Sequence, residues 1–150
     1  MNKKGQVSTE YLVILAVVLV VALVVVFLVG GFSGLGAGSI ETQSKNYWAG
    51  ASPFSLKTYR YAGTEVMIEI VNNDIDQLTL TDISVEGSSI FSTSSVFDSG
   101  ESTVINATAA SPCGTTGDPF QLENVVITYN KGGIAGITQA GVKPIVGKCS

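Results

Sequence analysis

The sequence contains no histidine, so the commonest general base and the commonest metal ligand are both missing. It has only two cysteines, and two cysteines without histidine are too few for a structural zinc site. No nucleophilic side chain is accompanied by a recognisable base, and no cluster of metal ligands stands out. The sequence therefore argues against an enzyme and indicates no cofactor and no metal site.

Basic residues are also scarce. Lysine and arginine number 8 against 12 aspartates and glutamates, which gives a formal net charge of -4 at pH 7. Only six of the basic residues follow Gly5, and they are scattered along the chain. Nucleic-acid binding needs positive charge gathered on one face or groove. The composition therefore excludes nucleic acid as an expected partner.

Charge is absent from residues 11–32, which form an unbroken run of 22 apolar or small residues. At a rise of about 1.5 Å per residue, a helix of this length extends roughly 33 Å, enough to cross a hydrocarbon core of about 30 Å. Lys3 and Lys4 precede the run, and the next basic residue is Lys45. Positive charge stays on the cytoplasmic side, so we expect the carboxyl-terminal part to face outward.

Valine makes up nine of the eighteen residues from Leu12 to Val29, although its helix propensity in water is only moderate. In lipid a single spanning segment must satisfy its own backbone hydrogen bonds, and this requirement favours the helix. Such a helix would be apolar on every face. It must therefore be surrounded by lipid or by other helices.

A secretory signal peptide is the first alternative for this segment. Its apolar region usually has about 7 to 15 residues and ends in small residues at the cleavage site. The run here is longer, but Gly36, Ala37 and Gly38 are small enough for cleavage. Removal of the whole segment is therefore one interpretation of the sequence.

A more specific pattern precedes the apolar run. A short lysine-containing leader ends in Gly5, and Gln6, Ser8 and Glu10 follow before the helix begins. Over about the first thirty residues, this order resembles the class III signal peptide of archaeal type IV pilins. Mature bacterial pilins usually begin with Phe or Met, so Gln6 is closer to the archaeal branch.

The resemblance implies cleavage between Gly5 and Gln6 by a prepilin peptidase, with the apolar helix retained on the mature subunit. It divides the chain into a leader at 1–5, a transmembrane or filament-core helix with a glycine-rich end at 6–38, and an extracellular head at 39–150. It also implies a helical homo-oligomeric filament, an assembly ATPase and a membrane platform protein as partners.

Glu10 is the one ionisable residue at the edge of the apolar run. In one interpretation, Ser8 or Thr9 caps the helix and the carboxylate lies near its positive end, a contribution of about 0.3 to 1 kcal/mol. In the other, which follows from the resemblance, Glu10 binds the new amino terminus at Gln6, in its own or a neighbouring subunit. A buried carboxylate needs such a cation.

Residues 30–38 contain five glycines in nine positions. Each glycine disfavours a helix in water by up to about 1 kcal/mol relative to alanine, so the segment could be a flexible joint. Small residues also allow helices to approach closely in a bundle. We expect the helix to continue past Gly31 and then to fray.

The remainder of the chain has the alternating pattern of β-strands. A change of phase near Thr81 predicts a bulge or a crossing between two sheets, and 130–133 form a turn. Six to eight short strands predict an α+β protein, in which a long apolar helix precedes a small antiparallel β-sandwich. The expected strands include 57–61, 66–70, 78–85, 102–109, 121–129 and 134–140.

Three further features of the head are candidate sites. Cys113 and Cys149 are predicted to form a disulfide, which would stabilise the exported head by about 3 to 4 kcal/mol, with two free thiols as the alternative. Asn106 begins an Asn-Ala-Thr acceptor for N-glycosylation, although an ordinary strand residue is an equal interpretation. The oxygen-rich loop at 72–76 lacks the glycine and distal glutamate of an EF-hand and is predicted to be a polar turn.

These features together predict a structural subunit of an archaeal type IV pilus-like filament, exposed on the cell surface and serving adhesion. The precursor would lie in the cytoplasmic membrane with its amino terminus inside. The alternative is a non-polymerising, single-span membrane-anchored protein with a binding β domain.

Overall fold

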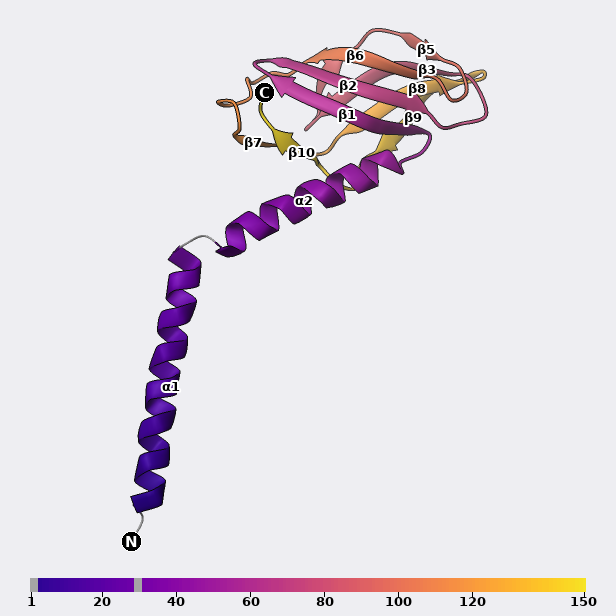
Figure 1. The fold of residues 1–150 in the computed structure, drawn as a ribbon. Helices are drawn as coiled ribbons and strands as arrows, with labels where there is room; N and C mark the ends of the chain where they lie inside the picture. Colours follow the sequence, from indigo (N-terminus) through magenta and orange to yellow (C-terminus); the bar gives the residue numbers. More distant parts are fainter. Residues whose placement is uncertain (1–2, 29–30) are drawn as a thin grey trace. The chain divides into compact units, whose positions relative to one another are not determined.

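A computed structural model describes residues 3–28 and 31–150, with side chains described at 8–28 and 38–150. The chain divides into two compact units, Met1–Ser39 and Ile40–Ser150 (Figure 1). Helix α1, Lys3–Leu28, forms most of the first unit, whereas helix α2, Gly31–Ala49, crosses the boundary between them. The fold therefore consists of a long apolar amino-terminal helix followed by an antiparallel β domain, which confirms the predicted fold class.

The β domain is built from three antiparallel sheets. One sheet has the order β1-β2-β6, a second has the order β4-β3-β8-β9 with β5 also paired to β3, and β10 pairs with β7. The strands are β1 Phe54–Ala62, β2 Glu65–Asn72, β3 Leu78–Val85, β4 Ser88–Phe91, β5 Ser95–Phe97, β6 Ser102–Thr108, β7 Pro119–Leu122, β8 Val126–Lys131, β9 Ile134–Ala140 and β10 Ile145–Lys148.

The two larger sheets enclose one hydrophobic core. Along β2, Val66, Ile68 and Ile70 are buried, and the residues between them are partly exposed, as the period of a strand with one buried face requires. Phe54 of the first sheet packs edge-on against Phe97 and Tyr129 of the second, with ring centroids 5.5 Å apart in both pairs. These contacts join the sheets face to face.

Ten residues of α2, 40–49, belong to the second unit together with the β domain. Ser44 and Trp48, one helical turn apart, are both buried. The Ser44 hydroxyl donates to the Pro144 carbonyl at 2.6 Å and accepts from the Val146 amide at 3.2 Å. The Trp48 indole donates to the Lys143 carbonyl at 3.1 Å. The carboxyl-terminal end of the helix is therefore bound to the last ten residues of the chain.

Most of the predicted strands are present, and the predicted irregularity near Thr81 is a register shift between Leu80 and Asp82 in the pairing of β3 with β8. The prediction of one continuous strand at 121–129 is wrong. The chain instead forms β7 and β8, because Asn124 adopts a left-handed conformation with φ of 49° and interrupts the strand. Strands β4, β5 and β10 have three or four residues each, too few for a clear alternating pattern.

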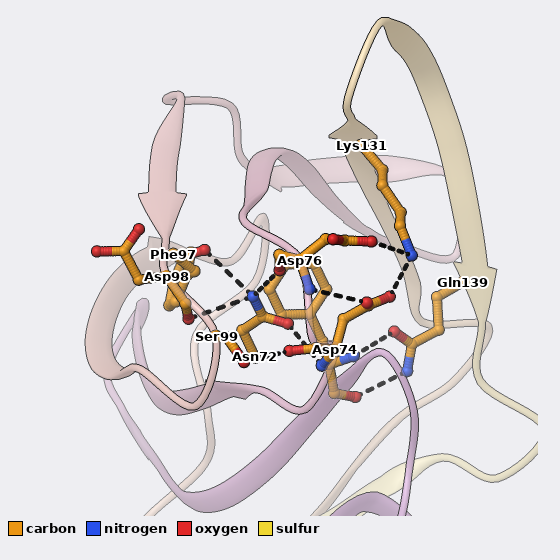
Figure 2. Close-up of polar contacts among 9 residues, drawn as sticks. Asn72, Asp74, Asp76, Phe97, Asp98, Ser99, Lys131 and Gln139 are labelled. Atoms are coloured by element: carbon orange, nitrogen blue, oxygen red, sulfur yellow. Dashed lines mark hydrogen bonds and ion pairs between the residues drawn. The ribbon is translucent and has the colours of Figure 1, made fainter.

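The oxygen-rich loop between β2 and β3 forms a polar turn around Asn72 (Figure 2). The Asn72 side chain is fully buried; its amide nitrogen donates to the carbonyls of Asp76, Phe97 and Asp98, and its oxygen accepts from the Asp74 amide. The Lys131 ammonium lies 2.7 Å from an Asp74 carboxylate oxygen and 3.2 Å from one of Asp76. Lys131, the last residue of β8, therefore places a positive charge beside two carboxylates of this loop.

Candidate functional site

From Tyr11 to Leu28, helix α1 presents an apolar surface on every side. From Ser8 to Leu28 every residue is exposed within the first unit, and the large side chains between Tyr11 and Leu28 are 42% to 78% exposed. Ser8–Leu28 is long and apolar enough to cross a membrane, and its 21 residues contain one charge, at Glu10. A helix without a polar face is not stable in water alone. Its surface therefore requires lipid or other apolar helices around it.

The residues of the predicted cleavage site lie at the start of this helix. The backbone of Gly5 and Gln6 belongs to α1, and their side chains lie outside the described residues. Glu10 is exposed and follows Gln6 by four positions. Positions four apart are neighbours on one helix face. A positive charge at Gln6 would therefore lie one helical turn from the Glu10 carboxylate.

The cysteines form a disulfide between Cys113, in the loop after β6, and Cys149, next to the end of the chain, with their Cα atoms 5.8 Å apart. Backbone hydrogen bonds surround the bridge: the Cys113 amide donates to the Gly63 carbonyl at 2.7 Å, and the Cys149 amide donates to Asp118 at 2.8 Å. Cys149 itself is only 3% exposed. The bridge therefore fixes the carboxyl terminus to the end of the β domain.

Asn106 lies on β6, where its side chain is exposed between the buried residues Ile105 and Ala107. Strand β6 pairs with β2 on one side only and is the edge of its sheet. Thr108, the hydroxyl residue of the acceptor triplet, is exposed as well. Both residues of the acceptor therefore face solvent in the isolated chain.

The contacts of α2 were not predicted from the sequence. Its anchoring residues are Ser44 and Trp48, and space for the Trp48 ring comes from Gly141, where a side-chain Cβ would lie 2.4 Å from two ring atoms. The Tyr47 hydroxyl also accepts from the Val142 amide at 3.0 Å. The available signal was the four-residue spacing between Ser44 and Trp48. The hydrogen-bond partners of these two residues, however, lie 95 to 102 positions away in sequence.

Among the described residues, five ionisable side chains have shifted pKa values, and hydrogen bonding or burial is the main cause of each; they are Lys45, Tyr59, Tyr61, Asp74 and Lys131. The hydrogen bond from Lys131 lowers the pKa of the Asp74 carboxyl. Burial raises the pKa of the Tyr59 phenol, whose hydroxyl donates to the Val146 carbonyl at 2.8 Å. The hydrogen bond to Glu41 raises the pKa of Lys45, and the two groups are 2.8 Å apart in α2. These shifts describe structural ion pairs and burial and do not indicate a catalytic group.

Comparison with known proteins supports the assignment of the amino-terminal segment. Residues 3–29 match the family model for the class III signal peptide. A search of curated proteins found no match to the chain. The match spans α1 and contains the membrane-length helix Ser8–Leu28. Residues 3–29 are therefore similar to the class III signal peptide of type IV pilin-like proteins, and an antiparallel β domain follows them in the chain.

Proposed function

We propose that the chain is a pilin, a structural subunit of an archaeal type IV pilus-like filament on the cell surface. The observation that carries the proposal is a coincidence of two features in one segment. The class III signal peptide match covers residues 3–29, and within it residues 11–28 of α1 are apolar and exposed on all sides. A signal of this class together with such a helix fits a membrane-anchored precursor that is later processed.

Processing occurs between Gly5 and Gln6 by a prepilin peptidase. Residues 1–5 are the leader, 6–38 are the retained helical segment and 39–150 are the extracellular head. Lys3 and Lys4 keep the leader on the cytoplasmic side, where the cut is made. The new amino terminus at Gln6 then meets the Glu10 carboxylate of its own or a neighbouring subunit. This pairing offsets the cost of a carboxylate among apolar helices.

Assembly exchanges one apolar environment for another. In the membrane, lipid covers the exposed surface of Ser8–Leu28. In the filament, equivalent helices of other subunits cover it, and close packing with exclusion of water stabilises the bundle. An assembly ATPase and a membrane platform protein drive the transfer. The heads form the outer surface of the filament, where they serve adhesion.

The head is suited to an extracellular position. A disulfide between Cys113 and Cys149 is stable in an oxidising environment. Asn106 is exposed on an edge strand and carries an N-linked glycan in this proposal. Mass spectrometry of surface material compared with an Asn106→Gln variant tests the modification: loss of added mass in the variant is expected. Identical masses after correction for the substitution would exclude it.

The decisive experiment is amino-terminal sequencing of protein sheared from cell surfaces. We expect the mature subunit to begin at Gln6 and to occur in sedimentable filaments. Replacement of Gly5 with leucine should leave the leader uncut and abolish the filaments. Shed protein that begins near Ser39 would overturn the proposal, because the apolar helix would then be discarded. An uncut chain found only in membranes would instead support a non-polymerising, single-span surface protein.

A further inference from the structure

Charge in the β domain and the adjoining end of α2 is divided along the chain. Between Tyr61 and Asn130 there is no lysine or arginine, but there are ten carboxylates. Residues 40–60 and 131–150 carry six cations and one carboxylate, Glu41, which gives them a net charge of +5. The cations are Lys45, Lys57, Arg60, Lys131, Lys143 and Lys148. These six cations are therefore confined to the first and the last part of the head sequence, although they are not clustered within those parts.

The fold brings most of these cations to one side of the β domain. Their segments contact one another: Ser44 of α2 bonds Pro144, and the Tyr59 hydroxyl of β1 bonds Val146. The Ser150 amide also donates to the Tyr61 carbonyl. A surface hollow is lined in part by Glu41, Lys45, Tyr59 and Lys148. We call the exposed cations of these segments the basic side; its members are Lys57, Arg60, Lys143 and Lys148.

Carboxylates lie on the opposite side of the sandwich. Strands β5 and β6 are on the far side of the β domain from residues 40–49 of α2 in Figure 1, and β4 is in contact with β6. The hairpin of β3 and β4, together with the loop between β5 and β6, contains acidic residues and no basic residue. We call these residues the acidic side; its members are Asp82, Glu86, Asp98 and Glu101.

Ion pairs within the head do not neutralise the charges of the basic side and the acidic side. Lys45 pairs with Glu41, and Lys131 pairs with Asp74 and Asp76. In the part of the chain that the structure describes, no member of the basic side or the acidic side belongs to an ion pair. Four cations and four carboxylates on opposite sides therefore remain without a partner of opposite charge in the same chain.

We propose that the basic side of one head binds the acidic side of a second copy of this chain. The two surfaces differ, so the contact is heterologous, and repetition of a heterologous contact that does not close yields an open helical array. Charge complementarity of this kind fixes orientation and register and suppresses wrong contacts. The inference rests on the proposed filament and assigns the surfaces by which neighbouring heads recognise one another. A second copy is favoured over an anionic membrane because the chain itself supplies the matching acidic surface.

Charge reversal on each side, alone and combined, tests the contact in cells that produce the full-length chain. Lys143→Glu with Lys148→Glu places carboxylates on both sides, and Glu86→Lys with Asp98→Lys places cations on both. Like charges across an interface cost several kcal/mol, so each pair of changes should lower the yield of sheared filaments about tenfold or more. The four changes together restore opposite charges and should return the yield to within about threefold of wild type.

Matched controls separate charge from other effects. Glu65→Lys changes the net charge as much as either single substitution of the acidic-side reversal and alters an exposed residue that belongs to neither side, so the yield should stay close to wild type. The quantity of disulfide-bonded chain in the membrane fraction reports whether each variant folds. Folded variants that assemble like wild type, or a combined variant no better than either pair, would overturn the inference.

Two further outcomes are informative. If the acidic-side variant assembles like wild type while the basic-side and combined variants do not, the basic side binds an anionic surface other than this chain, such as lipid, and the proposed contact is wrong. If wild-type cells make no filaments at all, the proposed function itself fails. Salt provides a test without mutation: wild-type filaments should shorten as ionic strength rises from about 0.01 to 1 M, since the screening length falls from about 30 to 3 Å. Filament length independent of salt would contradict a charged contact.

Discussion

The side-chain amide of Gln139 forms both hydrogen bonds of a β-bridge with the backbone of Phe54. Its nitrogen donates to the Phe54 carbonyl at 2.8 Å, and its oxygen accepts from the Phe54 amide at 3.0 Å. Gln139 lies on β9 at the edge of one sheet, and Phe54 begins β1 at the edge of another (Figure 2 shows Gln139). A side chain thus joins the two sheets where no backbone ladder does.

Replacement of Gln139 with alanine should destabilise the head. Phe54 is fully buried, so its amide and carbonyl would lose their partners, at a cost of about 1 to 3 kcal/mol for each group left unpaired. The free energy of unfolding can be followed by the fluorescence of Trp48, the single tryptophan, in the full chain held in detergent. Thr138→Ala, an exposed change on the same strand, is the control. Equal stability of the two variants would contradict the role of the bridge.

Gly141→Ala should weaken the docking of α2 on the head. An added Cβ would lie 2.4 Å from two atoms of the Trp48 ring and 3.3 Å from the Val125 carbonyl oxygen, so the helix or the loop must move. Overpacking of this kind typically costs about 1 to 3 kcal/mol. Faster hydrogen exchange of amides at 44–49 is the expected readout. At Gly133 an added Cβ meets nothing within 4 Å, so Gly133→Ala should leave exchange unchanged.

Loss of the disulfide should lower the stability of the head without altering the helix in the membrane. The bridge closes a loop across a sequence separation of 36, and the chain-entropy treatment gives about 3 to 4 kcal/mol for such a loop. The double variant Cys113→Ala with Cys149→Ala should unfold at correspondingly lower denaturant concentration. Reduced wild-type protein should match it. A double variant as stable as the oxidised wild type would show that the bridge contributes nothing.

The ion pair of Lys131 should make stability depend on acid pH. Lys131 lowers the pKa of Asp74, so the carboxylate stabilises the folded head fully above its unfolded pKa of about 3.9, and that contribution is lost as the pH falls through the folded pKa. Lys131→Met should therefore reduce stability at pH 7 and converge with wild type at the acid end. Lys57→Met removes an exposed cation that forms no ion pair among the described residues, so its stability should depend on pH in the same way as that of wild type. A constant difference across the acid range would rule out this linkage.

Glu10→Gln should prevent assembly while leaving export and cleavage intact. The new amino terminus at Gln6 would lose its carboxylate partner, and a buried charge left unpaired costs about 3 to 5 kcal/mol. We expect at least a tenfold loss of sheared filaments with the same amount of mature chain in the membrane. Glu41→Gln, which removes a carboxylate from α2, is the matched control for charge. Wild-type filament yield from the Glu10 variant would refute the pairing.

Much of the fold could be predicted because its signals are local. The charge-free run at 11–32 predicts the amino-terminal helix, and alternation along Val66, Ile68 and Ile70 predicts a strand with one buried face. The shift of phase near Thr81 predicts the register change between Leu80 and Asp82. Each of these signals is contained in a few neighbouring residues, which is why the sequence displays it.

What the sequence did not predict depends on distant partners. The glycine-rich segment predicts a helix that frays after Gly31, and the fraying is wrong: α2 continues to Ala49, because its end is stabilised by Ser44 and Trp48 against residues about 100 positions later. The hydrogen bonds of Gln139 with Phe54 and the ion pair of Lys131 with the oxygen-rich loop also join residues that are distant in sequence. The separation of charge also emerges only when both ends of the chain come together in space.

The binding surface for the end of α2 is formed late in synthesis. Since Ser44 binds Pro144 across 100 residues of sequence, the helix end has no binding surface until residues 143–146 have been made. Residues 40–49 must therefore wait for these later residues before they can dock on the β domain. The attachment of this helix is thus a late step in folding.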